Sequence, residues 1–339
     1  MKFTNNNLLS MNSLKTPLMR YKNVIAVRYN STNGGSTINP WTITGITDGD
    51  GSFYVSILKS TKNTIGWSVL INYQLIASIN SANLAMFEQV KSFFGDIGNI
   101  SKHEVDNTLR YTVSGVASCK IIKNHFLNYP LLTYKLVYFQ LWCSVLDIMA
   151  KNEHLTLEGL LKIVALKAQF KKGLSDLLLT NFSNYIPAIK PSFEPNLALM
   201  NIHWLSGFIS ADGHFGFFIR KNIKCALGVS CDVIISITQD KVSLITLEHI
   251  ATFLGFGKIS KDSANRTTYT YYLGSVKNVN LFIEKFKGFN LLGAKALDYA
   301  DFCKGIEIIN SKEHLTQEGL NKLNTLLQHM NSKRTNFES

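Results

Sequence analysis

Two aspartates close two matching segments of the chain, and they are the side chains best suited to catalysis. Asp50 ends residues 43–50 (ITGITDGD), Asp212 ends residues 205–212 (LSGFISAD), and a glycine follows each. We expect each segment to be a short helix that ends at Asp-Gly, with the glycine in the left-handed conformation and a strand beyond it. A single Asp-Gly pair is usually turn chemistry. Its repetition in matched context favours a shared function.

Small residues recur on these helices at intervals of four. Gly45 and Gly49 share one face of the first helix, and Gly207 and Ala211 share one face of the second. Such faces allow helices to pack more closely than the usual ~8–10 Å. The two aspartates would then emerge side by side, each at the negative end of a helix dipole and facing a like charge. A pair of this kind requires a cation, and hard carboxylate oxygens suit Mg²⁺.

The repetition extends through the rest of the chain. Residues 153–160 (EHLTLEGL) match residues 313–320 (EHLTQEGL), and residues 126–135 match residues 286–295 at aromatic, leucine and lysine positions. The offset is close to 160 residues throughout. We therefore predict two half-domains of one design joined in a single chain.

The expected boundaries follow from composition. The half-domains cover residues 38–172 and 201–333, and a proline-containing linker covers residues 173–200. Residues 1–37 are predicted to be a disordered basic leader, because they contain lysine and arginine but no acid and are rich in Ser, Thr and Asn. A mitochondrial transit peptide and the remnant of an upstream reading frame both fit this composition, and both place the protein in mitochondria.

Hydrophobic periodicity gives the same element order in each half. In the first half we predict strands near residues 51–60, 66–79, 99–103 and 109–114, and helices near 84–94, 117–126, 131–151 and 157–171. In the second half we predict strands near residues 213–222, 227–238, 258–261 and 268–274, and helices near 242–254, 276–286, 292–309 and 317–330.

Composition restricts the partner. The 339 residues carry 35 Lys+Arg against 23 Asp+Glu, a net charge of +12, which suits a polyanion such as nucleic acid or an anionic membrane surface. No apolar stretch is long enough to span a membrane. The five cysteines form no C-x-x-C pair, which argues against a disulfide framework or a zinc site.

Both motifs, together with residues 38–41 (INPW), make the chain resemble the LAGLIDADG homing endonucleases, specifically the single-chain, two-motif kind of fungal mitochondrial introns. The resemblance runs from about residue 38 to about residue 333. Many relatives carry Glu at the last acidic position, where this chain has Asp twice. The resemblance implies an α+β fold with two pseudo-symmetric αββαββα halves. In each half, a four-stranded antiparallel sheet would lie as a saddle along the DNA major groove.

The resemblance also implies a mechanism: a monomer hydrolyses one phosphodiester in each strand of double-stranded DNA and leaves short 3′ overhangs. Mg²⁺ is the expected cofactor, Mn²⁺ a substitute, and Ca²⁺ an ion that binds without supporting cleavage. Asp50 and Asp212 would be metal ligands, joined by the backbone carbonyls of Gly49 and Ala211. Lys135 and Lys295 match family positions near the scissile phosphate, and Gln239 matches a family position that orients water around the metal. We assign all three to catalysis together with both aspartates.

Strand alternation then predicts the residues that face DNA. In the first half they are Ser52, Tyr54, Ser56, Ser60, Ser68, Asn72, Gln74, Ser78, Asn99, Ser101, His103, Arg110 and Thr112. In the second half they are His214, Arg220, Asn222, Lys224, Ser230, Asp232, Lys258, Ser260, Tyr269 and Tyr271. Any one of these alone would read as an ordinary solvated strand position. Lys162, Lys167, Lys171 and Lys172 would meet phosphates or solvent.

The sequence leaves several alternatives open. The first half has no glutamine that matches Gln239, and either Asn80 or Ser81 could take its place. Asp48 has no acidic counterpart, because Ser210 stands there, so we expect Asp48 to be structural or to support the metal ligands. A maturase that binds its host intron RNA and assists its splicing is the competing function, either instead of cleavage or as a second role beside it, and a cleavage-dead DNA binder is a third. No membrane partner is expected.

Overall fold

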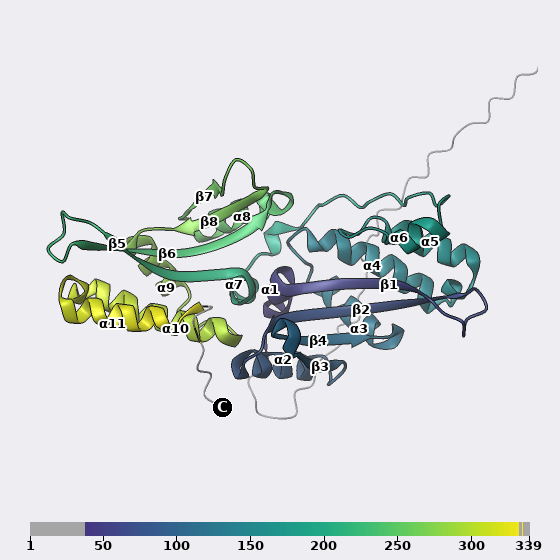
Figure 1. Ribbon diagram of the computed structural model, residues 1–339, viewed down its shortest axis with the longest axis horizontal. Helices are drawn as coiled ribbons and strands as arrows, with labels where there is room; N and C mark the ends of the chain where they lie inside the picture. The colour runs from purple at the N-terminus through teal and green to yellow at the C-terminus, as the bar shows by residue number, and fades with distance from the viewer. Residues whose placement is uncertain (1–37, 332–333, 335–339) are drawn as a thin grey trace, which may run out of the picture. The chain divides into compact units, whose positions relative to one another are not determined.

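The computed structural model describes residues 38–331 and 334, and the predicted leader lies outside these residues. The described chain contains two four-stranded antiparallel sheets, with strand orders β1-β2-β4-β3 and β5-β6-β8-β7 (Figure 1). The same order in both confirms the prediction of an α+β fold built from two pseudo-symmetric halves.

The elements of the first half are α1 (Pro40–Asp50), β1 (Gly51–Lys59), β2 (Trp67–Ser78), α2 (Ser81–Phe93), β3 (Asn99–His103), β4 (Thr108–Ser114), α3 (Val116–Asn128), α4 (Lys135–Ala150) and α5 (Leu157–Lys167). Those of the second half are α7 (Ile202–Asp212), β5 (Gly213–Lys221), β6 (Val229–Asp240), α8 (Leu244–Leu254), β7 (Lys258–Lys261), β8 (Thr268–Leu273), α9 (Val276–Lys285), α10 (Gly293–Asn310) and α11 (Gln317–Gln328).

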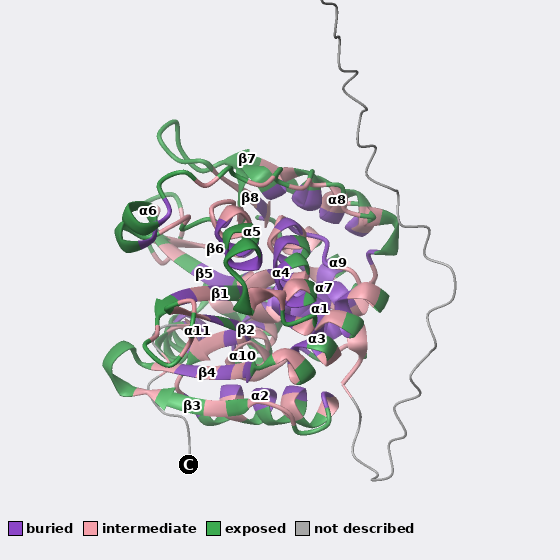
Figure 2. Ribbon diagram, turned by 90° about the vertical axis from the view of Figure 1, so that its right-hand side faces the viewer, coloured by how far each residue is buried: buried purple, intermediate pink, exposed green. Residues whose placement is uncertain are grey.

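Each sheet buries one face against its helices because apolar residues alternate along the strands. On β1, Phe53, Val55 and Ile57 are buried as predicted, and the ring of Phe53 packs against Phe126 and Trp142. The helices in turn bury one side and expose the other, as α2 and α8 illustrate (Figure 2). The opposite face of each sheet carries mostly half-buried and exposed side chains and is free to meet a partner.

The segment between the halves contains structure of its own. It forms the short helix α6 (Asp176–Asn181), whose Leu178 is buried. Farther along, Phe182 packs on Trp67 and Phe193 packs on Tyr134, with ring centroids 5.0 and 5.4 Å apart. These contacts hold the segment against the first half.

Hydrogen bonds link the two halves in a nearly symmetric way. The backbone N–H of Tyr134, just before α4, donates to Ser243 Oγ of the second half (3.0 Å). The backbone N–H of Ala294, at the start of α10, donates to Asn83 Oδ1 of the first half (2.8 Å). Each half thus supplies a side-chain acceptor to a backbone N–H at the start of a helix in the other half, a group that has no partner within its own helix.

No helix among the described residues is both long enough and apolar enough to cross a membrane.

Candidate active site at the paired helices

Helices α1 and α7 are built alike and lie side by side (Figure 1). Asn39 Oδ1 caps the start of α1 by accepting from the N–H of Trp41 (2.9 Å). Asn201 Oδ1 caps α7 by accepting from the N–H groups of His203 and Trp204 (3.0 Å each). Asparagine is among the best N-cap residues, so each helix begins where the sequence places this signal.

The glycines that follow the aspartates differ from our prediction. Gly51 and Gly213 are extended, with φ of −78° and −70°, rather than left-handed. A strand begins at each glycine, and its N–H donates back to the carbonyl of Thr47 or Ile209. A Cβ on Gly51 would lie 2.6 Å from the Thr47 carbonyl oxygen, and one on Gly213 would lie 2.5 Å from that of Ile209. Glycine is therefore needed for space at a direct helix-to-strand junction.

Two glycines at the crossing bring the helix backbones into contact. A Cβ on Gly45 would lie 2.0 Å from the carbonyl oxygen of Trp204, and one on Gly207 would lie 2.0 Å from that of Thr42. Nearer the helix ends, a Cβ on Gly49 would lie 2.3 Å from the Cβ of Ala211. The predicted small-residue faces do meet, and this close approach brings the ends of the two helices together.

Asp50 and Asp212 lie close enough for their charges to interact. Burial raises the pKa of Asp50 to about 7, and the negative charge of Asp212 adds to the rise. Burial also raises the pKa of Asp212, while Lys135 and Gln239 act against it. Two half-buried carboxylates that repel each other and cannot both ionise freely form a site that a divalent cation would stabilise.

Two lysines from matched positions face these carboxylates. Lys135 Nζ donates to the backbone carbonyl oxygens of Thr47 (3.2 Å) and Gly49. Burial lowers the pKa of Lys135, and the charges of Asp212 and Asp50 oppose that effect. Burial likewise lowers the pKa of Lys295, opposed by Asp298 and by both site aspartates. The structure thus brings both predicted lysines into the electrostatic field of the carboxylate pair.

Gln239 contacts one carboxylate, but the first half has no matching amide. Gln239 Nε2 donates to Asp212 Oδ2 (2.6 Å). In the ladders, Gly51 pairs with Leu75 and Gly213 pairs with Ile237, so the first-half counterpart of Gln239 is Ala77.

Neither residue expected to replace the glutamine does so. Asn80 caps α2, accepting from the N–H of Asn83 (2.7 Å) and donating to the carbonyl and hydroxyl of Ser78 (3.2 Å each). Ser81 is the first residue of α2. The prediction fails because the strand register, rather than local sequence similarity, determines which residues of the two halves are equivalent.

Asp48 is a buried hydrogen-bond hub. Its Oδ2 accepts from the N–H of Leu132 and from Trp204 Nε1 (2.8 Å each), and its Oδ1 accepts from the N–H (3.0 Å) and hydroxyl (2.5 Å) of Thr133. Asp48 therefore fixes the segment that precedes α4 and Lys135. At the matching position, Ser210 Oγ accepts from the N–H of Leu292 (2.9 Å), which fixes the segment before α10 and Lys295. Of the two expected roles, the structural one fits these contacts.

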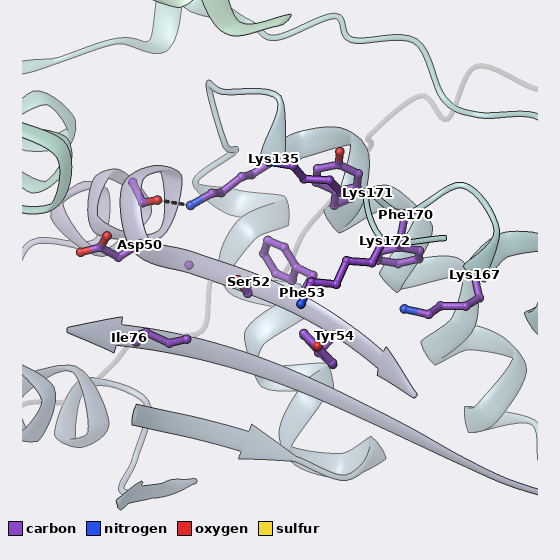
Figure 3. A pocket seen from close by; sticks show the side chains of 13 residues that line it. Asp50, Ser52, Phe53, Tyr54, Ile76, Lys135, Lys167, Phe170, Lys171 and Lys172 are labelled. Atoms are coloured by element: carbon purple, nitrogen blue, oxygen red, sulfur yellow. Dashed lines mark hydrogen bonds between the residues drawn. The ribbon is translucent and has the colours of Figure 1, made fainter. Parts of the chain in front are cut away.

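A pocket of about 540 Å³ adjoins Asp50 (Figure 3). Lys135, Lys167, Lys171 and Lys172 line it together with Tyr54, Tyr138 and Phe170. Lys167 Nζ lies 5.7 Å from the ring centroid of Tyr54 and 5.4 Å from that of Phe170. Four lysines around one hollow beside Asp50 make a site suited to phosphate groups.

The exposed face of the first sheet carries the polar residues predicted to meet DNA. Ser52 is opposite Gln74, Tyr54 is opposite Asn72, and Arg110 is opposite Ser101. The ladders place the rest of the predicted strand set on the same face: Ser56, Ser68, Ser78, Asn99, His103 and Thr112. Ser60 lies one residue beyond β1. Arg110 is held by Asp106, and Gln74 donates to Thr112 Oγ1 (2.9 Å).

In the second sheet most of the predicted residues also lie on the exposed face. The ladders put His214, Arg220, Ser230, Asp232, Lys258 and Ser260 there. Asn222 and Lys224 lie in the hairpin loop beyond β5, where the backbone N–H of Lys224 donates to Asn222 Oδ1 (3.1 Å).

The assignment of Tyr269 and Tyr271 to this face is wrong. Tyr271 is 1% exposed and pairs with buried Ile237, and Tyr269 also packs against the core. Burial is possible because the Tyr271 hydroxyl donates to the carbonyl of Phe256 (2.7 Å). The residues of β8 on the exposed face are Thr268, Thr270 and Tyr272, and Thr270 shares a hydroxyl hydrogen bond (2.7 Å) with Thr238.

Comparison with known proteins identifies the class of protein to which this fold and this site belong. The family model described as LAGLIDADG endonuclease matches residues 43–146 and 205–306, and the chain belongs to this family. Both matches begin within the paired helices described above, so the repeat seen in the sequence is the repeat of the family.

Individual relatives are similar over most of this chain. A probable intron-encoded endonuclease 3 of Neurospora crassa is 28% identical over 93% of this chain and 58% of its own length. A probable intron-encoded endonuclease 2 of the same organism is 32% identical over 84% of this chain and 64% of its own length. The chain thus spans about three fifths of the length of these relatives.

Solved structures are similar over nearly their full length. The I-SmaMI LAGLIDADG homing endonuclease bound to cleaved DNA is 34% identical, with a TM-score of 0.83 over 87% of this chain and 98% of that chain. I-SmaMI has also been solved on uncleaved target DNA in the presence of calcium ions (34% identity, TM-score 0.81, 86% and 98% coverage). The I-LtrWI LAGLIDADG homing endonuclease bound to target DNA is 32% identical, with a TM-score of 0.81 and coverage of 87% and 98%.

Proposed function

We propose that this protein is a site-specific homing endonuclease that cuts both strands of a DNA duplex with the help of Mg²⁺. One observation carries the proposal: α1 and α7 present Asp50 and Asp212 next to each other, between two sheets whose exposed faces carry polar residues. The fold's similarity to endonucleases solved on DNA supports a duplex as the substrate.

The donor set fits a divalent cation. Among the described residues, no group of three or more His, Cys, Asp and Glu could hold a metal, so the proposed ligands are two carboxylates and neighbouring backbone oxygens. Asp50 and Asp212 would hold the cation, with the carbonyls of Gly49 and Ala211 as further ligands. Lys135 Nζ donates to the Gly49 carbonyl oxygen in this structure, so the ammonium would have to release that oxygen to the cation. When bound, a divalent cation would supply positive charge at the phosphate and would lower the pKa of a water molecule at the site, so that the water loses a proton more easily and becomes a better nucleophile.

The chain's own residues prepare the substrate. Lys135 and Lys295 offer positive charge close to the carboxylates, where an additional negative charge would develop on a phosphate under attack. Gln239 holds the Asp212 carboxylate in orientation through its 2.6 Å hydrogen bond. The lysine-lined pocket beside Asp50 would take a neighbouring phosphate of the backbone. Because each half provides one aspartate, each half would serve one DNA strand, and the family resemblance implies short 3′ overhangs.

Relatives named as intron-encoded suggest the biological setting. We infer that the protein acts as a monomer in mitochondria, where cleavage of an intron-free allele promotes intron mobility. Its natural target would then be the exon junction that flanks its host intron.

Replacement of either aspartate tests the proposal. Asp50→Asn and Asp212→Asn should each abolish double-strand cleavage of the exon-junction duplex in Mg²⁺ and leave specific binding largely intact, because the amide is a poor metal ligand of nearly equal size. Asp147→Asn is the matched control, because Asp147 is an exposed residue paired with Lys123. Undiminished cutting by either site variant would reject the metal-ligand assignment. Binding that does not weaken as salt rises would argue against a DNA partner.

A further inference from the structure

The exposed face of the first sheet contains two leucines among polar residues. Leu58 of β1 and Leu70 of β2 are 50% and 46% exposed. Leu58 pairs with Ser68 and Leu70 pairs with Ser56, so the leucines are diagonal neighbours on the face predicted to meet DNA. We call them the leucine pair. Large aliphatic side chains in this position do not serve the core, which lies on the other face of the sheet.

The same place in the second sheet has the opposite chemistry. Counted from the first strand residue, Arg220 of β5 matches Leu58, and through the ladders Asp232 of β6 matches Leu70. Arg220 Nε lies 3.4 Å from Asp232 Oδ2, and the two side chains are 66% and 51% exposed. An ion pair so open to water adds little stability, roughly 0–1 kcal/mol. Both groups therefore stay available to a partner.

Base edges in the major groove match these two chemistries. Thymine alone presents a methyl group there, and apolar side chains contact it. Guanine presents two acceptors that suit arginine, and cytosine presents an amino donor that suits aspartate. An arginine beside an aspartate can therefore read a G·C pair, whereas two leucines can read thymine methyls.

We propose that the leucine pair binds thymine methyl groups in one half-site of the target, and that Arg220 and Asp232 read a G·C pair at the matching place in the other half-site. This inference rests on the proposed function and specifies its substrate. Leu58 and Arg220 are each eight residues beyond the site aspartate of their half. At ~3.3 Å per strand residue and ~3.4 Å per base, both would lie roughly 8 base pairs from the cleavage centre.

Single-atom changes in the DNA test the leucine pair. The target is first obtained by selecting cleaved duplexes from a randomised library. Each thymine is then replaced by deoxyuridine, which removes the methyl and keeps the base pairing. We expect the dissociation constant to rise about 4-fold for each methyl contacted, at positions roughly 8 base pairs out in one half-site. The rise should vanish in the Leu58→Ala, Leu70→Ala double variant.

The arginine–aspartate position is tested in the same way. Replacement of guanine by 7-deazaguanine, which removes one acceptor, should weaken binding at the matching place of the other half-site by about 5-fold or more. Arg220→Ala should abolish this sensitivity. Both variants change exposed side chains, and unaltered thermal melting serves to show that they fold.

An exchange of the two chemistries is the decisive test. Leu58→Arg with Leu70→Asp should change the selected base pair in the first half-site from T·A to G·C, while the second half-site stays unchanged. Two results would overturn this inference and leave the endonuclease proposal intact. The first is that cleaved targets show no effect of thymine methyls at the outer positions of either half-site. The second is that the preferred base pair stays the same after the exchange. Failure to bind or cut any duplex specifically would overturn both.

Discussion

The contact between α1 and α7 predicts a large effect of adding a single methyl group. In Gly45→Ala the new Cβ would lie 2.0 Å from the Trp204 carbonyl oxygen and 2.6 Å from the Phe208 nitrogen. Both atoms belong to the α7 backbone and cannot rotate away, so the helices would have to separate by about 1 Å to reach the shortest observed contacts, near 3.0 Å. Overpacking of this kind costs about 1–3 kcal/mol or more.

One effect opposes the clash. Alanine is a better helix former than glycine by about 1 kcal/mol, which offsets part of the clash. A clash with backbone atoms lies at the upper end of the overpacking cost, about 3 kcal/mol or more. After the offset we therefore expect Gly45→Ala to lower the free energy of unfolding by about 2 kcal/mol or more in urea titrations. It should also slow cleavage, because separated helices move Asp50 away from Asp212. A free energy of unfolding within 0.5 kcal/mol of the parent would refute the close-packing argument.

A nearby pair of sites provides the matched control. In Gly49→Ala the new methyl meets the Ala211 side chain rather than backbone. Adding Ala211→Gly moves the same methyl from one helix to the other, so the double variant should recover most of the stability lost by Gly49→Ala. Gly45→Ala should not be rescued by any change of side chain on α7.

Three further predictions concern the polar groups of the site. Asp48→Asn should lower the free energy of unfolding by about 2–5 kcal/mol in urea titrations. The new amide NH₂ group would face the Leu132 N–H and the Trp204 indole, two buried donors that then lack an acceptor. A change below 0.5 kcal/mol would contradict the structural role of Asp48. Since the pKa of Asp50 is raised to about 7, the folded chain holds this proton more tightly than the unfolded one, so metal-free stability from this group should fall between about pH 4 and pH 7. Thermal melting should show this fall in the parent and not in Asp50→Asn, and Mg²⁺ should counteract it by binding the ionised form; a parent melting curve without it would count against the raised pKa. Gln239→Ala should slow the cut that depends on Asp212 and accumulate nicked plasmid, and equal slowing of both strand cuts would contradict its assignment to one carboxylate.

The sequence was sufficient to predict the centre of the molecule. The repeated helices, with Gly45 and Gly207 at matched positions, predicted a close pair because the same small-residue spacing occurs twice in matched context. The same repetition marked Lys135 and Lys295, which the structure brings to the carboxylates. A repeat allows each half to serve as a check on the other, which a single copy of either motif would not provide.

Prediction failed where tertiary contacts decide which way a strand faces. In β8, threonine and tyrosine alternate, and either residue type suits either face. Tyr271 is buried with its hydroxyl donating to the carbonyl of Phe256, and its first-half counterpart Tyr111 is buried with its hydroxyl donating to that of Ile97. The signal therefore lies in the repeat rather than in the alternation within β8. The sequence does not reveal Ala77 as the counterpart of Gln239, because the strand pairing aligns the two halves differently from the local similarity of their sequences. Leu58 and Leu70 are absent from the predicted DNA-facing set because that set contains polar side chains and tyrosines only.

The hydrogen bonds exchanged between the halves bear on how such proteins diversify. The N–H of Tyr134 relies on Ser243, that of Ala294 relies on Asn83, and the indole of Trp204 relies on Asp48. A chimera made by fusing one half to the half of another relative would keep each sheet intact and yet break these pairings. Halves from different relatives should therefore combine well only when the donor and the acceptor of each hydrogen bond are transferred together. Recombination of DNA-binding surfaces is then limited by a few polar contacts between the halves rather than by the surfaces themselves.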